Sequence, residues 1–307
     1  MIPIFVSTSQ FDNDNLISAN ELAGLALRPT FNPTGRRLTE DEISHFLSQG
    51  FVGLIAGLEP LTSGVLKSAT ALRVIARVGT GLDTVDTTCA ANLGIAVVNT
   101  PNATTDAVAE LTLGHILSAL RGITRADRQM RDGQWTPYMG RLLKDKTVGV
   151  IGFGRIGQRV AQLVEAFGAN VLLHDITLTS QTDGRWRELL NLCAEADVIS
   201  IHTPLVDDTR NLIGTREIKT MKHGAILVNV ARGGIVDEEA LIHALRDGHI
   251  FAAIDCFARE PYSGDLTSLD NVSFTPHMGS YAKETRAMME QEAAMNLVKE
   301  LLRLRIL

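Results

Sequence analysis

A glycine-rich turn between a predicted strand and a predicted helix constrains the fold of this chain most. The apolar run Thr147–Ile151 leads directly into Gly152-Phe153-Gly154-Arg155-Ile156-Gly157, and a helical pattern follows. Gly152 would permit the tight turn, Gly154 would let the backbone approach a pyrophosphate, and Gly157 would let helix and strand pack closely. The N-terminus of the helix would offer unpaired N–H groups to the phosphates. The turn therefore predicts a dinucleotide-binding unit.

The residue that ends the next predicted strand indicates which dinucleotide binds. Asn170–His174 runs into Asp175, whose carboxylate can accept both ribose hydroxyls. Asp175 would also repel a 2′-phosphate, and Ile176-Thr177-Leu178 supplies no cation to offset this repulsion. We therefore predict NAD(H) rather than NADP(H). The alternative is a glycine-rich turn that binds nothing, and the position of Asp175 argues against it.

Short apolar runs alternate with helical patterns along most of the chain, which is typical of parallel α/β architecture. Strands are predicted at Ile2–Val6, Phe51–Ala56, Arg73–Val78, Ile95–Val98, Thr147–Ile151, Asn170–His174, Asp197–His202, Ala225–Val230, Ile250–Asp255 and Val272–Thr275. Helices are predicted from Ile156 to Phe167 and at Asp106–Leu120, Glu238–Asp247 and Lys283–Leu304. Thr39 and Glu42 have the spacing of a capping box.

Composition narrows the class of protein. A length of 307 residues, 45% of them hydrophobic, predicts two domains that each bury a core. The formal charge of −6 and the lack of a long basic run argue against nucleic-acid binding. The scattered Cys89, Cys193 and Cys256 argue against a disulfide framework or a Cys-rich zinc site, so no metal is predicted. The N-terminus lacks the pattern of a signal peptide and no apolar run is long enough to span a membrane, so we expect a cytoplasmic protein.

Polar residues follow several predicted strands. His202-Thr203-Pro204, Ala231-Arg232-Gly233-Gly234, Asp255 and His277 each stand at a strand end. Because the carboxyl ends of parallel strands share one edge of a sheet, these residues are expected to form one active-site rim.

These stretches resemble the D-isomer-specific 2-hydroxyacid dehydrogenases over essentially the whole chain. The resemblance rests on Gly152–Gly157, His202–Leu205, Val228–Asp237, Asp255–Pro261 and Thr275–Gly279, in the order of the family. It implies a Rossmann-type doubly wound parallel sheet for the cofactor domain, with a smaller flavodoxin-like α/β substrate domain. Their expected bounds are residues 99–282 for the NAD-binding domain and residues 1–98 with 283–307 for the substrate domain.

The resemblance implies three catalytic residues, and the chemistry of each is consistent with oxidation of a 2-hydroxy acid. His277 would take the hydroxyl proton, since the ordinary pKa of histidine is about 6.5. Glu260 would orient the His277 ring, and Arg232 would bind the substrate carboxylate and the C2 oxygen. Structural alternatives remain for each: a histidine without chemistry, a solvated loop carboxylate, and an arginine in a domain-interface ion pair.

The resemblance also implies a larger set of NAD-binding residues. Asp255 is expected on the nicotinamide side, with a helix cap as the alternative. The full set is Thr100, Gly152, Gly154, Arg155, Ile156, Gly157, Asp175, His202, Thr203, Pro204, Val230, Ala231, Asp255, Gly279 and Ser280.

The expected substrate is a small anionic 2-hydroxy or 2-keto acid. N–H groups of the turn Gly79-Thr80-Gly81 could bind a carboxylate, and the expected substrate-binding residues are Arg77, Val78, Gly79, Thr80, Gly81, Arg232 and His277. Because Arg77–Asp83 resembles the D-3-phosphoglycerate dehydrogenases in particular, Arg77 predicts a second anionic group, as in 3-phosphoglycerate or a phosphonate acid. The alternative is a surface ion-pair arginine. The mildly acidic chain is expected to concentrate cations at Arg77 and Arg232.

Three further expectations follow from the family. A reductase of glyoxylate, hydroxypyruvate or another 2-keto acid is the alternative enzyme, and an NADH-sensing corepressor is the alternative binding protein. A homodimer is expected through the cofactor domain, using Asp106–Leu120 and the arm that follows to Arg141. The chain ends after its terminal helix, so serine feedback through a C-terminal domain is not expected.

Three residues depart from the usual pattern of the family, namely Cys256, Arg259 and Tyr281. Of these, Arg259 and Tyr281 could alter the rim of the substrate pocket.

Overall fold

The computed structural model describes residues 1–24, 26–178 and 183–306. The chain forms two compact units. Unit 1 comprises Met1–Thr104 and Ser280–Leu307, and unit 2 comprises Thr105–Gly279. These boundaries differ from the expected 98/99 and 282/283. Residues up to 104 stay with unit 1 because Thr100 and Thr104 hydrogen-bond to the turn at Gly79-Thr80.

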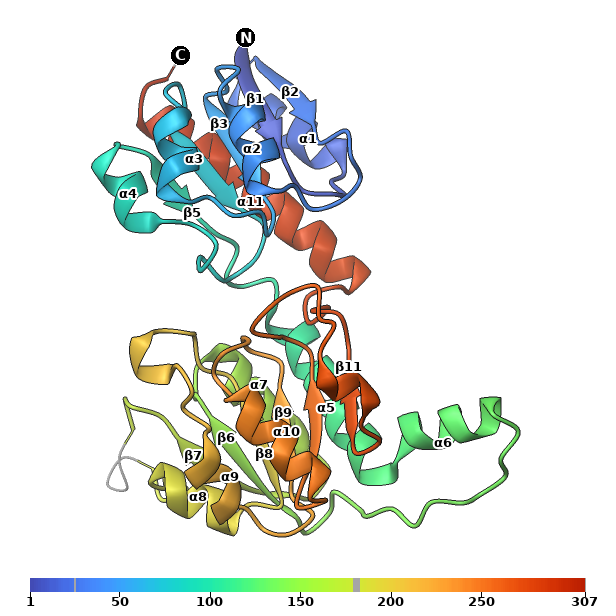
Figure 1. The fold of residues 1–307 in the computed structure, drawn as a ribbon. Helices are drawn as coiled ribbons and strands as arrows, with labels where there is room; N and C mark the ends of the chain where they lie inside the picture. The colour runs from blue at the N-terminus through green and yellow to red at the C-terminus, as the bar shows by residue number, and fades with distance from the viewer. Residues whose placement is uncertain (25, 179–182, 307) are drawn as a thin grey trace. The chain divides into compact units, whose positions relative to one another are not determined.

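Unit 1 is a five-stranded parallel sheet with helices on both faces (Figure 1). Its strand order, β2-β1-β3-β4-β5, is that of flavodoxin-like folds. The strands are β1 (Ile2–Val6), β2 (Leu27–Phe31), β3 (Gly53–Ala56), β4 (Val74–Arg77) and β5 (Ala96–Val98), and the helices are α1 (Asn13–Ala23), α2 (Glu40–Leu47), α3 (Ser63–Ser68), α4 (Thr87–Asn92) and α11 (Lys283–Arg303).

Alternating side chains of the strands supply both cores of unit 1. Ile4 and Val6 pack in a cluster with Leu297 of α11, whereas Phe5 packs on the opposite face with Ile43 of α2. All of these side chains are fully buried. The terminal helix therefore belongs to the unit formed by the N-terminal part of the chain, as the discontinuous domain bounds require.

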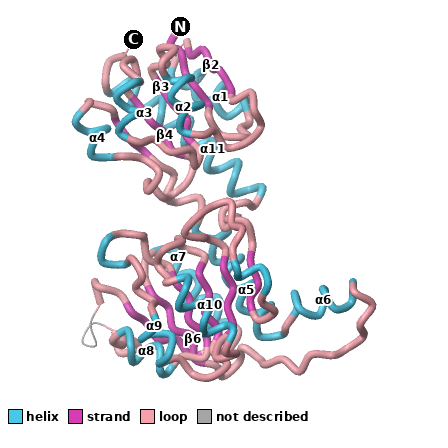
Figure 2. Tube along the Cα trace, in the orientation of Figure 1, coloured by secondary structure: helices cyan, strands magenta, loops and turns pink. Residues whose placement is uncertain are grey.

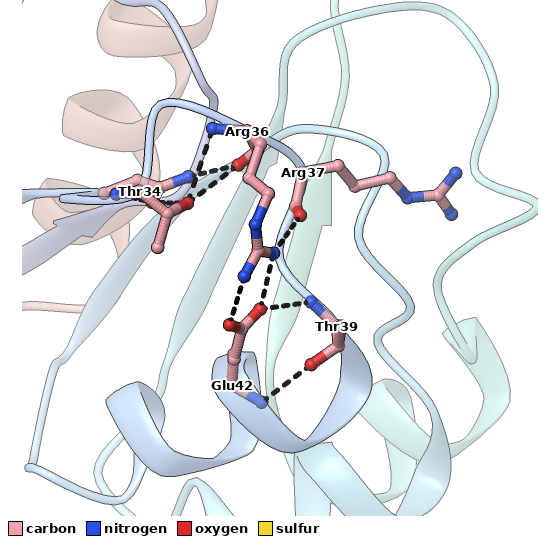
Figure 3. A network of polar contacts seen from close by, with 6 residues as sticks. Thr34, Arg36, Arg37, Thr39 and Glu42 are labelled. Atoms are coloured by element: carbon pink, nitrogen blue, oxygen red, sulfur yellow. Dashed lines mark hydrogen bonds and ion pairs between the residues drawn. The ribbon is translucent and has the colours of Figure 1, made fainter. Parts of the chain in front are cut away.

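The sequence correctly predicts how α2 begins. Thr39 Oγ1 accepts the N–H of Glu42 (3.3 Å), and the Glu42 carboxylate accepts the N–H of Thr39 (2.9 Å), which completes a capping box (Figure 3). Arg36 donates to the same carboxylate (2.6 and 2.9 Å) and, with the Thr39 N–H, lowers the pKa of Glu42 to about 2.

Unit 2 is a six-stranded parallel sheet with the order β11-β10-β9-β8-β6-β7. Figure 2 shows its strands in magenta among the cyan helices. The strands are β6 (Thr147–Ile151), β7 (Asn170–His174), β8 (Val198–Ile201), β9 (Ile226–Asn229), β10 (Phe251–Ile254) and β11 (Val272–Phe274). The helices are α5 (Thr105–Arg121), α6 (Ile123–Arg131), α7 (Arg155–Ala166), α8 (Leu189–Glu195), α9 (Thr215–Thr220) and α10 (Glu238–Arg246), with 3₁₀ turns at Asp207–Thr209 and Asp265–Ser268. One core packs against α5 and α7, and the other packs against α8, α9 and α10.

The strand order of each sheet reverses beside its first strand. In unit 2 the reversal lies between β6 and β8, and open α/β sheets bind ligands beyond the strand ends at such a point. In unit 1 the reversal lies between β1 and β3, where Glu59 is 1% exposed. The Glu59 carboxylate accepts the Ser7 hydroxyl and the N–H of Gly57 (3.0 and 3.1 Å).

The segment that follows α5 extends from the body of unit 2 (Figure 1). Helix α6 buries no residue. The ring of Tyr138 lies where a side chain at Gly122 would stand, and the Arg125 guanidinium lies over it at 5.6 Å from the ring centroid, so the returning part of the arm is held to the start of α6. The described residues include no helix long and apolar enough to cross a bilayer.

Candidate active site

The glycine-rich turn between β6 and α7 is as tight as the sequence predicts. Gly152 has a φ of +89°, and a Cβ there would lie 2.7 Å from the His202 carbonyl and 2.8 Å from the Thr203 nitrogen. A Cβ at Gly157 would overlap the Gly152 carbonyl oxygen. Only glycines allow this approach, which brings the end of β6 against the end of β8 at the switch point.

The start of α7 is suited to bind a pyrophosphate. Gly154 precedes the helix, makes no side-chain cap, and has open space within 4 Å of the position a Cβ would take. The N–H groups of the first helical turn thus face a space that a side chain does not fill. Arg155 and Ile156, which form the start of that turn, are exposed and half-buried. This cradle fits the pyrophosphate of NAD.

Asp175 is held ionised beside this turn. Its carboxylate accepts the Phe153 N–H (2.7 Å) and both the N–H (2.8 Å) and the hydroxyl (2.6 Å) of Thr177. Burial opposes the negative charge, but these hydrogen bonds outweigh it and lower the pKa of Asp175 below its ordinary value. The carboxylate is positioned to accept ribose hydroxyls next to the phosphate cradle.

His202 lies at the end of β8 as a neutral side chain. Its Nε2 is 2.8 Å from the Ser200 hydroxyl, and burial lowers the pKa of His202 to about 3. Thr203 is half-buried and Pro204 is exposed. The backbone of this segment, packed on Gly152, therefore forms the wall of the switch point.

The loop after β9 places Arg232 beside the loop after β10. Asn229 spans the first loop, since its side chain accepts the Ala231 N–H (3.1 Å) and donates to the Arg232 carbonyl (2.9 Å). A Cβ at Gly233 would overlap the backbone of Phe257, so the two loops are in close contact. Arg232 is half-buried and donates to the Ala231 carbonyl (2.7 Å), and the preceding Val230 is buried.

Glu260 and His277 form a hydrogen-bonded pair. The Nδ1 atom of His277 lies 3.0 Å from Oε1 and 2.9 Å from Oε2 of Glu260. A carboxylate only accepts, so Nδ1 carries the proton and donates it. Both side chains are about one quarter exposed, which leaves the pair accessible. The arrangement leaves Nε2 as the nitrogen that can exchange a proton with a ligand.

Asp255 holds the loop that carries His277. Its side chain is fully buried and accepts the Thr275 hydroxyl and the N–H groups of Met278 (2.9 Å) and Gly279 (3.0 Å). Its backbone carbonyl also accepts the His277 N–H (2.8 Å), and His277 has a φ of +52°. Asp255 thus fixes the backbone on both sides of His277.

His115 of α5, for which the sequence indicated no function, supports the loop that carries His277. His115 is 6% exposed, and its Nε2 lies 3.1 Å from the Thr275 hydroxyl. Because that hydroxyl gives its proton to Asp255, Nε2 of His115 must be the donor. Burial lowers the pKa of His115, although nearby Asp255 raises it. The signal in the sequence was weak, namely one histidine on the buried face of a helix.

The remaining predicted residues lie in unit 1. Arg77 is 7% exposed, and its guanidinium donates to the Val78 carbonyl and lies over Gly79. The N–H of Gly79 donates to Thr100 Oγ1 (2.7 Å), so a carboxylate bound at this turn would need other N–H groups.

Around this turn, Val78 is buried, Thr80 is exposed and Gly81 is half-buried. Ser280 is half-buried at the start of the C-terminal segment of unit 1.

Known proteins are similar to this chain over most of its length. Residues 113–279 match the family model "D-isomer specific 2-hydroxyacid dehydrogenase, NAD binding domain". A glyoxylate reductase of Aeropyrum pernix is 44% identical over 250 residues, which cover 76% of this chain and 75% of the relative.

A D-3-phosphoglycerate dehydrogenase of Methanocaldococcus jannaschii is 40% identical over 272 residues, which cover 86% of this chain but 51% of the relative. The solved structure of the TT0316 protein of Thermus thermophilus superposes with a TM-score of 0.88 at 35% identity and covers 98% of this chain and 97% of that one. The match to the NAD-binding domain covers more than half of the chain, and the chain belongs to the D-isomer-specific 2-hydroxyacid dehydrogenases, with NAD as its cofactor.

Proposed function

We propose that this dehydrogenase interconverts a small, unphosphorylated 2-keto acid and its D-2-hydroxy acid, with glyoxylate and hydroxypyruvate as the first candidates. The observation that carries the proposal is the environment of Arg77. Its guanidinium is buried against the backbone of its own turn, so it supports Gly79 instead of presenting a cation to a phosphate. The similarity to a glyoxylate reductase over three quarters of both chains supports the same substrate class.

The proposed mechanism uses the Glu260–His277 pair. The chemistry that NADH would supply when bound is a hydride for C2 of the keto acid. Nε2 of His277 donates a proton to the substrate oxygen during reduction and takes it back during oxidation. Because Nδ1 donates to Glu260 in both states, the ring keeps its orientation while the proton at Nε2 is exchanged. Arg232 binds the substrate carboxylate with its planar set of donors.

A phosphorylated three-carbon acid is the second candidate substrate. The run Arg77–Asp83 and the similarity to a D-3-phosphoglycerate dehydrogenase favour it. The two candidates differ in what Arg77 does, since a phosphate ligand would need a cation that the substrate reaches.

The test is NADH-linked turnover of glyoxylate, hydroxypyruvate, pyruvate and 3-phosphohydroxypyruvate by wild type and Arg77→Ala. We expect the larger wild-type kcat/KM on the unphosphorylated acids, and an equal proportional loss on all substrates in the variant because the turn at Gly79 loosens. The matched control is Arg73→Ala, which removes an exposed arginine near the same strand and should change nothing. A loss about tenfold larger on the phosphorylated acid would establish the second candidate instead.

We also propose that Asp175 selects NAD(H) over NADP(H). Its carboxylate is held ionised by Phe153 and Thr177, so a 2′-phosphate would meet a negative charge. We expect Asp175→Ala to raise the ratio of kcat/KM for NADPH to that for NADH by roughly 10–100-fold, as removal of one repulsive contact of about 1.4–2.7 kcal/mol requires. Steady-state kinetics with both cofactors measure the ratio. An unchanged ratio would mean that another feature excludes the phosphate.

A homodimer through unit 2 is proposed from the exposed arm. Large apolar side chains gather on α6 and the segment after it, at exposures of 51–92%: Ile123, Met130, Trp135 and Met139. An apolar surface of this kind is typical of an interface between subunits. The Glu260–His277 hydrogen bonds form within one chain, so they do not depend on the proposed dimer.

We expect Trp135→Glu to convert the dimer to a monomer in sedimentation equilibrium. The substitution would place a charge on a side chain that is 84% exposed in the single chain, so it should not unfold the protein. Leu302→Glu, at an exposed position of α11, is the control and should sediment as wild type does. A wild type that sediments as a monomer would refute the proposal.

A further inference from the structure

Three side chains of unit 2 bring metal-ligating atoms into one small volume. One atom each from Cys256, Glu260 and His277 lies within 4.8 Å of the other two. Over the described ranges, no second group of three histidine, cysteine, aspartate or glutamate side chains meets this condition. Cys256 is 2% exposed, whereas Glu260 and His277 are each about one quarter exposed. The group is therefore anchored in the protein on one side and open to solvent on the other.

We propose that this group is an inhibitory zinc site. Zn²⁺ bonds of about 2.0–2.3 Å in a tetrahedron put ligand atoms roughly 3.3–3.6 Å apart. The Glu260 oxygens and His277 Nδ1 are already 2.9–3.0 Å apart, and Sγ of Cys256 lies within 4.8 Å of its partners. Side-chain shifts of about an ångström or less would complete a three-ligand site, with water in the fourth position.

The donor set selects the metal. A thiolate, an imidazole and a carboxylate suit Zn²⁺, whereas Mg²⁺ and Ca²⁺ prefer ligand sets made of oxygen. The buried Cys256 supplies the thiol that completes this donor set. Mg²⁺ is consequently the appropriate negative control.

Zinc at this site would stop the proton transfer proposed for His277, so the inhibition rests on the proposed function. On binding, Cys256 loses its proton to solvent, and the proton on Nδ1 of His277 moves to Nε2 as Nδ1 bonds to zinc. Nε2 then carries a proton and cannot accept one from a hydroxy acid. In the other direction, donation from Nε2 would leave an imidazolate, a state far less accessible than neutral imidazole. Both directions are therefore blocked while zinc is bound.

The kinetic test compares Zn²⁺ with Mg²⁺ during NADH-linked turnover. We expect inhibition by Zn²⁺ that a chelator reverses, and no inhibition by Mg²⁺. Cys256→Ala should keep turnover and raise the zinc concentration for half-inhibition by at least about tenfold. Cys256→Val is the second variant if the alanine variant fails to fold. Cys89→Ala removes a partly exposed thiol from unit 1 and should leave the zinc response unchanged. Undiminished inhibition in the Cys256 variants would overturn the proposal.

A second readout does not depend on turnover. Co²⁺ bound at the site should give a near-ultraviolet thiolate-to-cobalt charge-transfer band in the wild type, and Cys256→Ala should lack it. If the chain reduced none of the keto acids but formed this band, the proposed function would fail while the metal site stood. Absence of the band in a folded wild type would overturn the site whatever the substrate. A band without zinc inhibition of an active enzyme would overturn the inhibitory role.

Discussion

His277→Asn is expected to lower kcat by roughly 10²–10⁴-fold, the usual contribution of a positioned acid or base. Asparagine has no group that exchanges a proton near neutral pH, but it tolerates the left-handed backbone at this position, where φ is +52°. The variant therefore separates chemistry from backbone strain better than an alanine would. NADH binding, measured by fluorescence titration, should change by less than about threefold because the glycine turn lies elsewhere in unit 2.

The matched variant for this experiment is Glu260→Gln. Its side-chain oxygen can still accept the Nδ1–H of His277, so the ring should stay oriented while the neighbouring negative charge is lost. We expect a smaller decrease in kcat, about 10–100-fold, with NADH affinity unchanged. Turnover by His277→Asn within tenfold of wild type would remove His277 from the mechanism.

The second large effect is expected on stability. Asp255→Ala removes the acceptor for the Thr275 hydroxyl and for the N–H groups of Met278 and Gly279. Three donors left without a partner cost at least about 1 kcal/mol each, and single substitutions rarely cost more than about 5 kcal/mol, so the free energy of unfolding should decrease by roughly 3–5 kcal/mol. Denaturant unfolding followed by circular dichroism measures the loss. Activity should decrease as well, since the loop that orients His277 loses its anchor.

Asp270→Ala is the control for the stability measurement. Asp270 is 87% exposed and pairs with Arg128 at 3.7 Å, so its removal should cost less than about 0.5 kcal/mol. Asp255→Asn is informative in addition, because it keeps one acceptor oxygen but turns an amide toward backbone donors. If Asp255→Ala unfolded at the wild-type denaturant midpoint, the buried carboxylate would not be the anchor of the His277 loop.

Much of the fold follows from apolar patterning, and its failures have clear causes. Strands β1, β6 and β7 have the bounds that their apolar runs predict. Strand β2 was missed because it is an edge strand with Arg28-Pro29-Thr30 at its centre, and proline is tolerated only where an N–H is not needed in the sheet. Helix α6 was missed because only Ile123, Ala126 and Met130 of its nine residues are apolar, and none of its residues is buried.

The sequence also predicts which polar residues gather, but less well what each contacts. The family resemblance correctly implies that Glu260 and His277 meet. It gives no sign that the acceptor positions of Asp255 are used by Thr275 and the following N–H groups, since a local sequence does not show how a buried carboxylate is satisfied. The role of Asp255 toward the nicotinamide stays a prediction. The prediction for Arg77 is limited in the same way. Its place in the chain suggested contact with a ligand, and only the fold shows that its guanidinium lies against Gly79.

The two sheets have similar strand orders, but the buried Glu59 makes their switch points differ. In unit 2 the switch point presents backbone donors with open space before them. In unit 1 the Gly57 N–H, which follows β3, donates to the chain's own Glu59 carboxyl group, and Ser7 at the end of β1 is a second donor. Glu59 thus satisfies these donors within the chain. The buried carboxyl group joins the segments that follow β1 and β3, so the Ser7 hydroxyl and the Gly57 N–H hold unit 1 together instead of binding a ligand.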